Sequence, residues 1–224
     1  MNSAIIVAAG SGTRFGSEIP KQFLEINGKP MVSHSITAFE NAVEIGEIVL
    51  VVSEADMDRA EMLRSDLNSK KLASIVAGGK TRAESVRNGF LALGKGGVVA
   101  VHDAARPLVL PNEIDKVLMR AREVGAACLT LPVTDTIKEV AGDLIKRTVD
   151  RKHLRRAATP QAFTYEILEN ALDSENLDPN ATDECFLVEK LGYDIAFIDG
   201  STQNIKITYP EDLQLAEAIL RSRN

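Results

Sequence analysis

The sequence predicts a single α/β domain over residues 1–224, with one doubly wound, mostly parallel sheet and a protruding β-hairpin arm. Short β-branched runs alternate with amphipathic stretches along most of the chain. Most of these runs are apolar at every position, as in strands covered by helices on both faces. A more polar run around Ala141-Gly142-Asp143 breaks the alternation and predicts the arm, at about residues 134–152.

The elements of the sheet follow in chain order. We expect strands at residues 4–9, 48–52, 74–77, 98–102 and 127–131, and a first helix at residues 31–40. Apolar residues at helical spacing predict two further helices, one near residues 83–93 and one near residues 114–121. A sheet of this kind binds ligands outside the carboxyl ends of its strands.

Beyond the arm, the pattern predicts helices near residues 165–172 and 183–191 and strands at residues 195–198 and 205–208. A last helix should begin with a capping box from Thr208 to Glu211, with Pro210 in its first turn.

Composition narrows the class of protein. The chain has 45% hydrophobic residues, 4% aromatic residues, no tryptophan and a formal charge of −6, which disfavours nucleic acid as a partner. No apolar run approaches the length of a membrane span, so we expect a soluble, cytoplasmic protein that does not bind membranes. Cys128 and Cys185 belong to no Cys-x-x-Cys pair and are expected to be reduced core thiols.

A glycine-containing loop, AAGSGTRFG, follows the first strand at residues 8–16. Glycines let backbone N–H groups approach a phosphate. The loop lacks the Gly-Lys-Ser/Thr ending of a P-loop, and its glycine spacing does not match the dinucleotide fingerprint. Arg14 and Lys21 could instead brace the β- and γ-phosphates of a nucleoside triphosphate. The alternative is a surface turn with two solvated cations.

The motif HDAARP follows the fourth predicted strand, which places Asp103 and Arg106 at the ligand-binding edge of the sheet. Asp103 could accept hydrogen bonds from polyol hydroxyls or help to hold Mg²⁺ through water, and Arg106 could bind the substrate with its guanidinium. The alternative is a local Asp103–Arg106 ion pair that stabilises the loop. His102 is interpreted as a packed residue at the end of the strand and not as a base.

Together, these motifs resemble those of the 2-C-methyl-D-erythritol 4-phosphate cytidylyltransferase family of nucleotidyltransferases. The resemblance covers nearly the whole chain, with every motif in the family's order. Besides the loop, the Pro-Lys-Gln run at residues 20–22 and HDAARP, the matching motifs are Gly78-Gly79 with Arg82 and Ser85, Asp135-Thr136, Thr148-Val149-Asp150-Arg151, Thr159-Pro160-Gln161, Thr182-Asp183-Glu184 and Asn204-Ile205-Lys206.

The resemblance implies a Rossmann-like nucleotidyltransferase that moves CMP from CTP, with Mg²⁺, onto a small polyol phosphate. It implies three groups of site residues: Arg14, Lys21 and Lys206 for catalysis; Ala8, Ala9, Gly10, Gly12, Gly79, Arg82, Ser85 and Ala104 for the nucleotide; and Asp103, Arg106, Thr136, Arg151, Thr159 and Thr182 for the acceptor. No direct metal ligand is assigned. It further implies a homodimer in which the arm carries Arg151 to the partner's site.

Three other functions stay open at this point. A ribitol 5-phosphate cytidylyltransferase would share the loop and the region of Lys21. A nicotinamide dehydrogenase would use the Gly10 loop for its cofactor. A non-catalytic nucleotide sensor would keep the fold and bind CTP without releasing pyrophosphate. The cationic run between Lys146 and Arg156 could also be a nucleic-acid patch, although without interleaved aromatics a solvated arm with one functional arginine is favoured.

Overall fold

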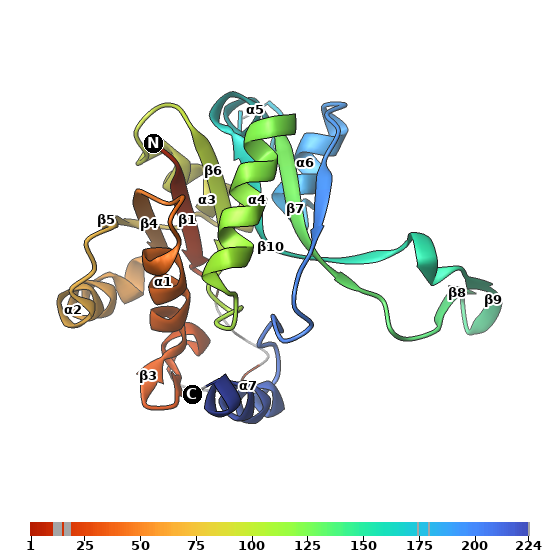
Figure 1. Cartoon of the computed structure of the whole chain (residues 1–224), viewed down its shortest axis with the longest axis horizontal. Helices are drawn as coiled ribbons and strands as arrows, with labels where there is room; N and C mark the ends of the chain where they lie inside the picture. Colours follow the sequence, from red (N-terminus) through yellow and green to blue (C-terminus); the bar gives the residue numbers. More distant parts are fainter. Residues whose placement is uncertain (11–14, 16–18, 174, 179, 224) are drawn as a thin grey trace.

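A seven-stranded sheet forms the centre of the molecule (Figure 1). The structure is a computed structural model that describes residues 1–10, 15, 19–173, 175–178 and 180–223. The strand order is β11-β7-β10-β6-β1-β4-β5, and all strands are parallel except β10, which is antiparallel to both β6 and β7. The bounds are Ser3–Ala8 for β1, Glu47–Val52 for β4, Leu72–Ala77 for β5, Val98–Asp103 for β6, Ala126–Pro132 for β7, Arg155–Thr164 for β10 and Ala196–Asp199 for β11.

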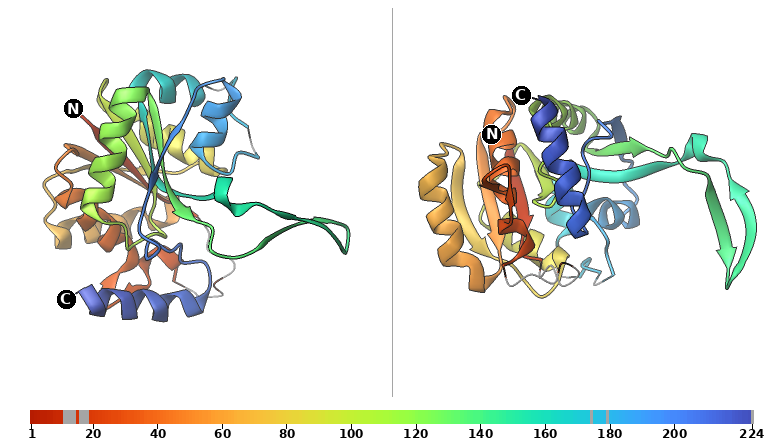
Figure 2. Two further views of the ribbon diagram at one scale, coloured as in Figure 1. Left: turned by 45° about the vertical axis from the view of Figure 1, so that its right-hand side comes forward. Right: turned by 90° about the horizontal axis from the view of Figure 1, so that it is seen from below.

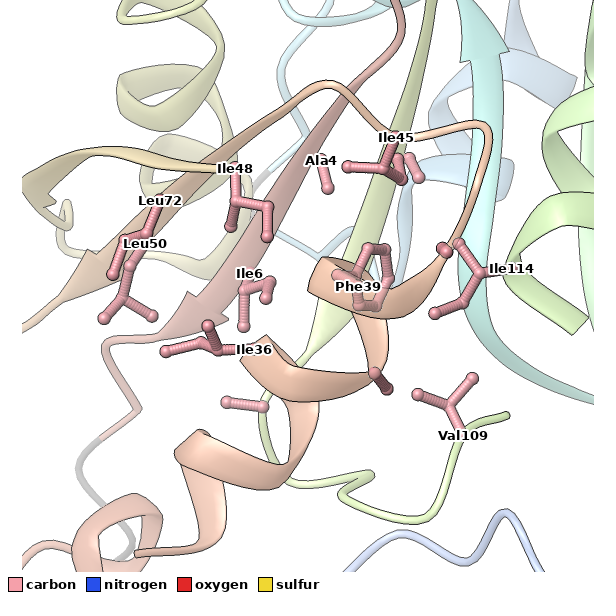
Figure 3. Packing of buried hydrophobic residues seen from close by; sticks show 14 of the residues in the cluster. Ala4, Ile6, Ile36, Phe39, Ile45, Ile48, Leu50, Leu72, Val109 and Ile114 are labelled. Carbon is pink, nitrogen blue, oxygen red and sulfur yellow. The ribbon is translucent and has the colours of Figure 1, made fainter. Parts of the chain in front are cut away.

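Helices cover both faces of the sheet, which confirms the α/β prediction. One face packs against α1 (Met31–Asn41), α2 (Met57–Leu67) and α4 (Pro111–Val124), and the other against α3 (Arg82–Leu91), α5 (Tyr165–Ala171) and α6 (Glu184–Lys190). Successive strand residues point to opposite faces, so Ala4 and Ile6 join the first core and Ile5 joins the second. Figure 3 shows Ile6 packed with Ile36 and Phe39 of α1. Cys128 and Cys185 are buried free thiols, as expected.

A third, smaller cluster joins the last helix to the main body. Helix α7 (Pro210–Arg223) lies beside a short hairpin of β2 (Glu25–Ile26) and β3 (Lys29–Pro30), with the C-terminal end close to β3 (Figure 1). Its Ala216 packs in a cluster with Ile26 and Ile207. This cluster holds the segment before α7 against the body near the carboxyl ends of the strands.

Two predictions for this region are wrong. Residues 205–208 do not form a strand: the N–H of Ile207 donates to Ala105 O at 2.8 Å, but the Ile207 carbonyl accepts from the side chain of Lys21, so no ladder develops. The predicted capping box from Thr208 to Glu211 does not form either. Asp212, one residue after Glu211, caps the start of α7, because its Oδ2 accepts from the N–H groups of Thr208 and Tyr209.

The predicted arm is present as β8 (Ile137–Ala141) and β9 (Leu144–Val149), followed by the short helix η4 (Arg151–His153). Gly142, at the turn, has a φ of 60°, which glycine adopts without strain. The arm extends away from the body in all three views (Figures 1 and 2). Within the part of the chain that the structure describes, no helix is long and apolar enough to cross a membrane.

Candidate active site

A cavity of about 430 Å³ opens at the carboxyl ends of β1 and β6. From β1 the chain adds β4 and β5 on one side and then returns to add β6 on the other, and such a switch point is where an open α/β sheet binds ligands. The cavity wall combines turns made of glycine and other small residues with charged side chains. Its residues are Val7, Ala8, Ala9, Gly10, Lys21, Gln22, Gly79, Lys80, Thr81, Arg82, Ser85, Asp103, Ala104, Ala105 and Lys206.

The turn after β5 packs closely against the end of the turn after β1. A Cβ at Gly78 would lie 2.5 Å from the Cβ of Ala9 and 2.9 Å from Ser85 Oγ, so this position requires glycine. Ser85 Oγ accepts from the N–H of Gly79 at 3.0 Å and donates to Thr81 O at 2.8 Å. These bonds hold the backbone of the turn at the cavity, beside the positive N-terminal end of α3.

Two lysines that are far apart in the sequence line this one cavity. Lys21 is the first residue of the short helix η2 (Lys21–Phe23), and its Nζ donates to Ile207 O at 2.8 Å. Lys206 Nζ donates to Asp103 Oδ2 at 2.7 Å. Because Lys21 binds the residue next to Lys206, the contact brings both cations to the same wall. The predicted Gly12 and Arg14 lie outside the described residues.

Asp103 is the carboxylate of the cavity, and both of its oxygens accept hydrogen bonds. Oδ1 accepts from Nε and Nη2 of Arg82, and Oδ2 accepts from Lys206. Burial alone would raise the pKa of Asp103, but Arg82 and Lys206 outweigh it and hold this pKa well below its usual range. Arg82 also donates from Nη1 to Glu184 Oε1. The local Asp103–Arg106 pair considered above is therefore replaced by pairs with residues distant in sequence.

Behind Asp103, a buried histidine and threonine support the end of β6. His102 Nε2 lies 3.2 Å from Arg106 O, and its Nδ1 lies 2.9 Å from Thr159 Oγ1. Thr159 Oγ1 also accepts from the N–H of Asp103 at 3.1 Å. Burial lowers the pKa of His102 to about 4. The ring is thus neutral near pH 7, in agreement with its interpretation as a packed residue.

The remaining predicted acceptor residues do not line this cavity within the single chain. Arg106 donates from Nη1 to Asn204 O and from Nη2 to Ala157 O. Thr136 and Arg151 are exposed on the arm, where Arg151 donates to Thr134 O. Thr182 lines a separate cavity of about 330 Å³, together with Cys128 and Cys185.

Sequence reasoning assigned no role to several polar residues of the site. Lys80 and Gln22 line the cavity, and the buried Nε2 of Gln22 has no hydrogen-bond partner within the part of the chain that the structure describes. Glu184 is buried and binds Arg82 across 102 positions of sequence. Their motifs were visible in the sequence, but their side-chain partners depend on the tertiary fold.

A divalent cation would have few protein ligands here. Over the described residues, no three His, Cys, Asp or Glu side chains gather as a metal site, and the carboxylate of Asp103 is engaged by two cations. This donor set fits Mg²⁺ only as an ion held mainly by phosphate oxygens and water, its usual mode with nucleotides.

Known proteins of one family match nearly the full length of this chain. The family model of 2-C-methyl-D-erythritol 4-phosphate cytidylyltransferase matches residues 2–222. A protein of that name from Pelotomaculum thermopropionicum is 42% identical over 225 residues, covering 99% of this chain and 94% of the relative. Another, from Halalkalibacterium halodurans, is 40% identical over 222 residues, covering 99% and 97%.

Solved structures agree with this match. The crystal structure of 4-diphosphocytidyl-2C-methyl-D-erythritol synthase from Anaerococcus prevotii superposes with a TM-score of 0.86 at 28% identity and covers 98% of this chain and 96% of its own. That of 2-C-methyl-D-erythritol 4-phosphate cytidylyltransferase from Thermus thermophilus has a TM-score of 0.77 at 31% identity, with coverage of 97% and 98%. With motifs, cavity and fold in accord, the chain belongs to the 2-C-methyl-D-erythritol 4-phosphate cytidylyltransferase family.

Proposed function

We propose that this protein transfers CMP from CTP to 2-C-methyl-D-erythritol 4-phosphate, giving 4-diphosphocytidyl-2-C-methyl-D-erythritol and pyrophosphate. One observation carries the proposal: Lys21 and Lys206 line the same cavity as the glycine turns at the switch point of the sheet. A site that combines backbone N–H groups with converging cations suits a triphosphate and a second phosphate. The names of the relatives specify the base and the acceptor.

In this reaction, a phosphate oxygen of the acceptor attacks the α-phosphorus of CTP in line with the bond to the β-phosphate. The new P–O bond forms as the α–β bridge breaks, and the electron pair leaves with pyrophosphate. The attacking oxygen is already ionised near neutral pH, so the enzyme mainly positions the phosphates and neutralises charge. Lys21 and Arg14 are assigned to the leaving triphosphate end, and Lys206 to the α-phosphate and the incoming phosphate. Bound Mg²⁺ would supply further charge neutralisation on the triphosphate oxygens.

The nucleotide is assigned to the end of β1 and the turn after it, to the turn after β5 and the first residues of α3, and to the residue after β6. Small residues at the cavity allow close approach of the base and sugar. The residues assigned to the nucleotide, of which all but Arg82 are small, are Ala8, Ala9, Gly10, Gly12, Gly79, Arg82, Ser85 and Ala104; all but Gly12 are described and line the cavity.

The acceptor is assigned to Asp103, Arg106, Thr159 and Thr182, completed by Thr136 and Arg151 of the partner subunit in a homodimer. Arg106 and Thr159 use their polar groups internally, so direct binding would require them to exchange partners. An exposed apolar surface on the arm supports the proposal of a dimer. Its Val140, Leu144 and Ile145 are 60%, 70% and 65% exposed, and such an apolar surface is typical of an interface.

Pyrophosphate release tests the proposal. Each of CTP, ATP, GTP and UTP is combined with methylerythritol phosphate or with ribitol 5-phosphate, in the presence of Mg²⁺. We expect release with CTP and methylerythritol phosphate. Release with ribitol 5-phosphate alone would favour the other cytidylyltransferase, and CTP binding without release would indicate a nucleotide sensor.

A further inference from the structure

Glu184 occupies a position that the proposed reaction does not itself explain. Its side chain is only 1% exposed, and among the described residues its buried Oε2 has no hydrogen-bond partner. Leaving a buried carboxylate oxygen unpaired costs free energy. The carboxylate has one strong contact, from Oε1 to Arg82 Nη1, which points to a role through Arg82.

Arg82 connects Glu184 to the cavity. While Nη1 donates to Glu184, Nε and Nη2 donate to Asp103 Oδ1 at 3.1 and 2.9 Å. Both edges of the planar guanidinium are therefore occupied, which leaves it one orientation. Asp103 then holds Lys206 at 2.7 Å through its other oxygen. Four charges of alternating sign run from the core to the cavity, ending at a lysine whose side chain is 47% exposed.

The start of α6 is itself anchored to the sheet. Gln161 of β10 donates from Nε2 to Asp183 Oδ2 at 2.8 Å and accepts from the N–H of Cys185 at 3.0 Å. Glu184 lies between these two anchored residues and cannot shift without breaking one of the bonds. This links the Thr159-Pro160-Gln161 and Thr182-Asp183-Glu184 motifs, which the reaction scheme leaves unconnected.

We propose that Glu184 is a positioning residue that fixes the guanidinium of Arg82 and thereby, through Asp103, the ammonium of Lys206 at the cavity. The proposal rests on the proposed function for its kinetic consequences, whereas the geometry of Arg82 can be tested without it. The two members of the pair differ in their electrostatics. At Glu184, burial outweighs the attraction of Arg82 and raises the pKa of the carboxyl. Burial disfavours a charged Arg82, but Glu184 and Asp103 outweigh burial and raise its pKa. Replacing the Glu184 carboxyl weakens the contact with Arg82 Nη1 that fixes the guanidinium.

The central variant is Glu184→Gln, which keeps the size of the side chain and removes its charge. Its matched control is Glu189→Gln, an exposed position on the same helix. We expect Glu184→Gln to lower kcat about 10-fold, since misplacing a reacting group by a fraction of an ångström is costly, while KM for CTP changes little. In an Asp103→Asn background the same substitution should cause no further loss, because the link to Lys206 is already broken.

A spectroscopic measurement separates this proposal from the proposed function. The Nε–H resonance of Arg82, assigned by its absence in Arg82→Lys, should be protected from solvent exchange in the wild type and in Glu189→Gln. It should exchange faster in Glu184→Gln. If the wild type transfers no cytidylyl group, the proposed function fails while this resonance still decides the role of Glu184.

Two results would overturn the proposal. The first is a Glu184→Gln variant with unchanged kcat and unchanged solvent exchange at Arg82. The second is a Glu184→Gln substitution that lowers kcat by the same factor in the wild type and in the Asp103→Asn variant. The second result would mean that Glu184 acts only on the stability of the fold. Should Glu184→Gln fail to fold, Glu184→Asp provides the same two readouts, since it keeps the charge and withdraws the carboxylate from Arg82 by one methylene.

Discussion

At the residue scale, the site depends on cations that are held in place by other parts of the protein before any ligand arrives. Lys206 is held by Asp103, and Lys21 by the carbonyl of Ile207. Preorganised charges of this kind stabilise a transition state because they need not reorient during the reaction. A triphosphate that enters the cavity would compete with these internal partners, and its several negative charges favour it in that competition.

Removing either lysine should therefore lower the turnover rate more than it weakens the binding of the nucleotide. We expect Lys21→Ala and Lys206→Ala each to reduce kcat by on the order of 10²-fold or more, as loss of a transition-state charge partner does. Steady-state pyrophosphate release with CTP and methylerythritol phosphate measures this. Lys95→Ala, at an exposed position outside the cavity lining, is the control. Near-normal turnover in either cavity variant would contradict the assigned mechanism.

His102 should make the fold sensitive to acid. Its pKa is about 4 in the folded protein because of burial, whereas an unfolded histidine titrates near 6.5. Between these values the unfolded state binds the extra proton, so the free energy of unfolding falls as the pH drops. The expected loss from this group is about 2 to 3 kcal/mol between pH 7.5 and 4.5.

Urea unfolding at these two pH values tests this expectation. His102→Asn should unfold more easily at pH 7.5 but lose less stability on acidification than the wild type does. His153→Asn, at an exposed position on η4, should keep the wild-type dependence. Equal pH dependence in His102→Asn and the wild type would show that His102 is not the group responsible.

At the scale of elements, the arm bears Thr136 and Arg151, which we propose for the acceptor site and which do not line the cavity of their own chain. Arg151 is exposed beyond β9, whereas Lys206 lines the cavity. If the arm completes the partner's site, a mixed dimer of Arg151→Ala and Lys206→Ala subunits contains one intact site. After subunit exchange at equal concentrations, we expect recovery of about a quarter of the wild-type activity, since half of the dimers in a two-fold symmetric assembly are mixed.

The control for this experiment is a mixture of Lys21→Ala and Lys206→Ala subunits. Both changes lie in the cavity of the same chain, so every site in every dimer stays defective and no activity should return. Recovery in this control, or none in the test mixture despite subunit exchange, would contradict a shared site.

The sequence predicted elements well where the pattern was regular. Strands β1, β4, β6 and β7 are mostly buried, β5 is a partly buried edge strand, and the arm followed from its turn. The prediction missed β10, which starts with Arg155-Arg156 and contains Pro160, a residue that usually argues against a central strand. The structure accommodates Pro160 at a register shift between Ala157 and Gln161.

The candidate site was predicted only in part, because only some of its residues lie in local sequence motifs. The turn at Gly78-Gly79 and the cavity lysines belong to local motifs, so their chemistry could be read along the chain. The binding of Arg82 by Glu184, or of Lys21 by Ile207, joins residues more than 100 positions apart. Such contacts follow from packing α6 and the segment before α7 against the sheet, which residue spacing does not encode.

At the scale of the whole molecule, helices pack on both faces of one seven-stranded sheet, so we predict a single domain. Thermal unfolding should show one transition. CTP with Mg²⁺ at about 100 times its Kd should raise Tm by about 5 to 10 °C, because a ligand that binds only the folded state stabilises it by mass action. Scanning calorimetry measures both properties, with GTP as the control nucleotide. Two separate transitions, or an equal shift with GTP, would contradict the prediction.

Strand β10 restricts where members of this family can gain or lose residues. It runs from the base of the arm into the middle of the sheet, and it carries Thr159 toward Asp103 and Gln161 toward α6. A residue inserted before Thr159 within the strand would reverse the facing of every side chain beyond it. Evolutionary insertions and deletions should therefore accumulate at the exposed tip around Gly142 and be purged between Arg155 and Thr164.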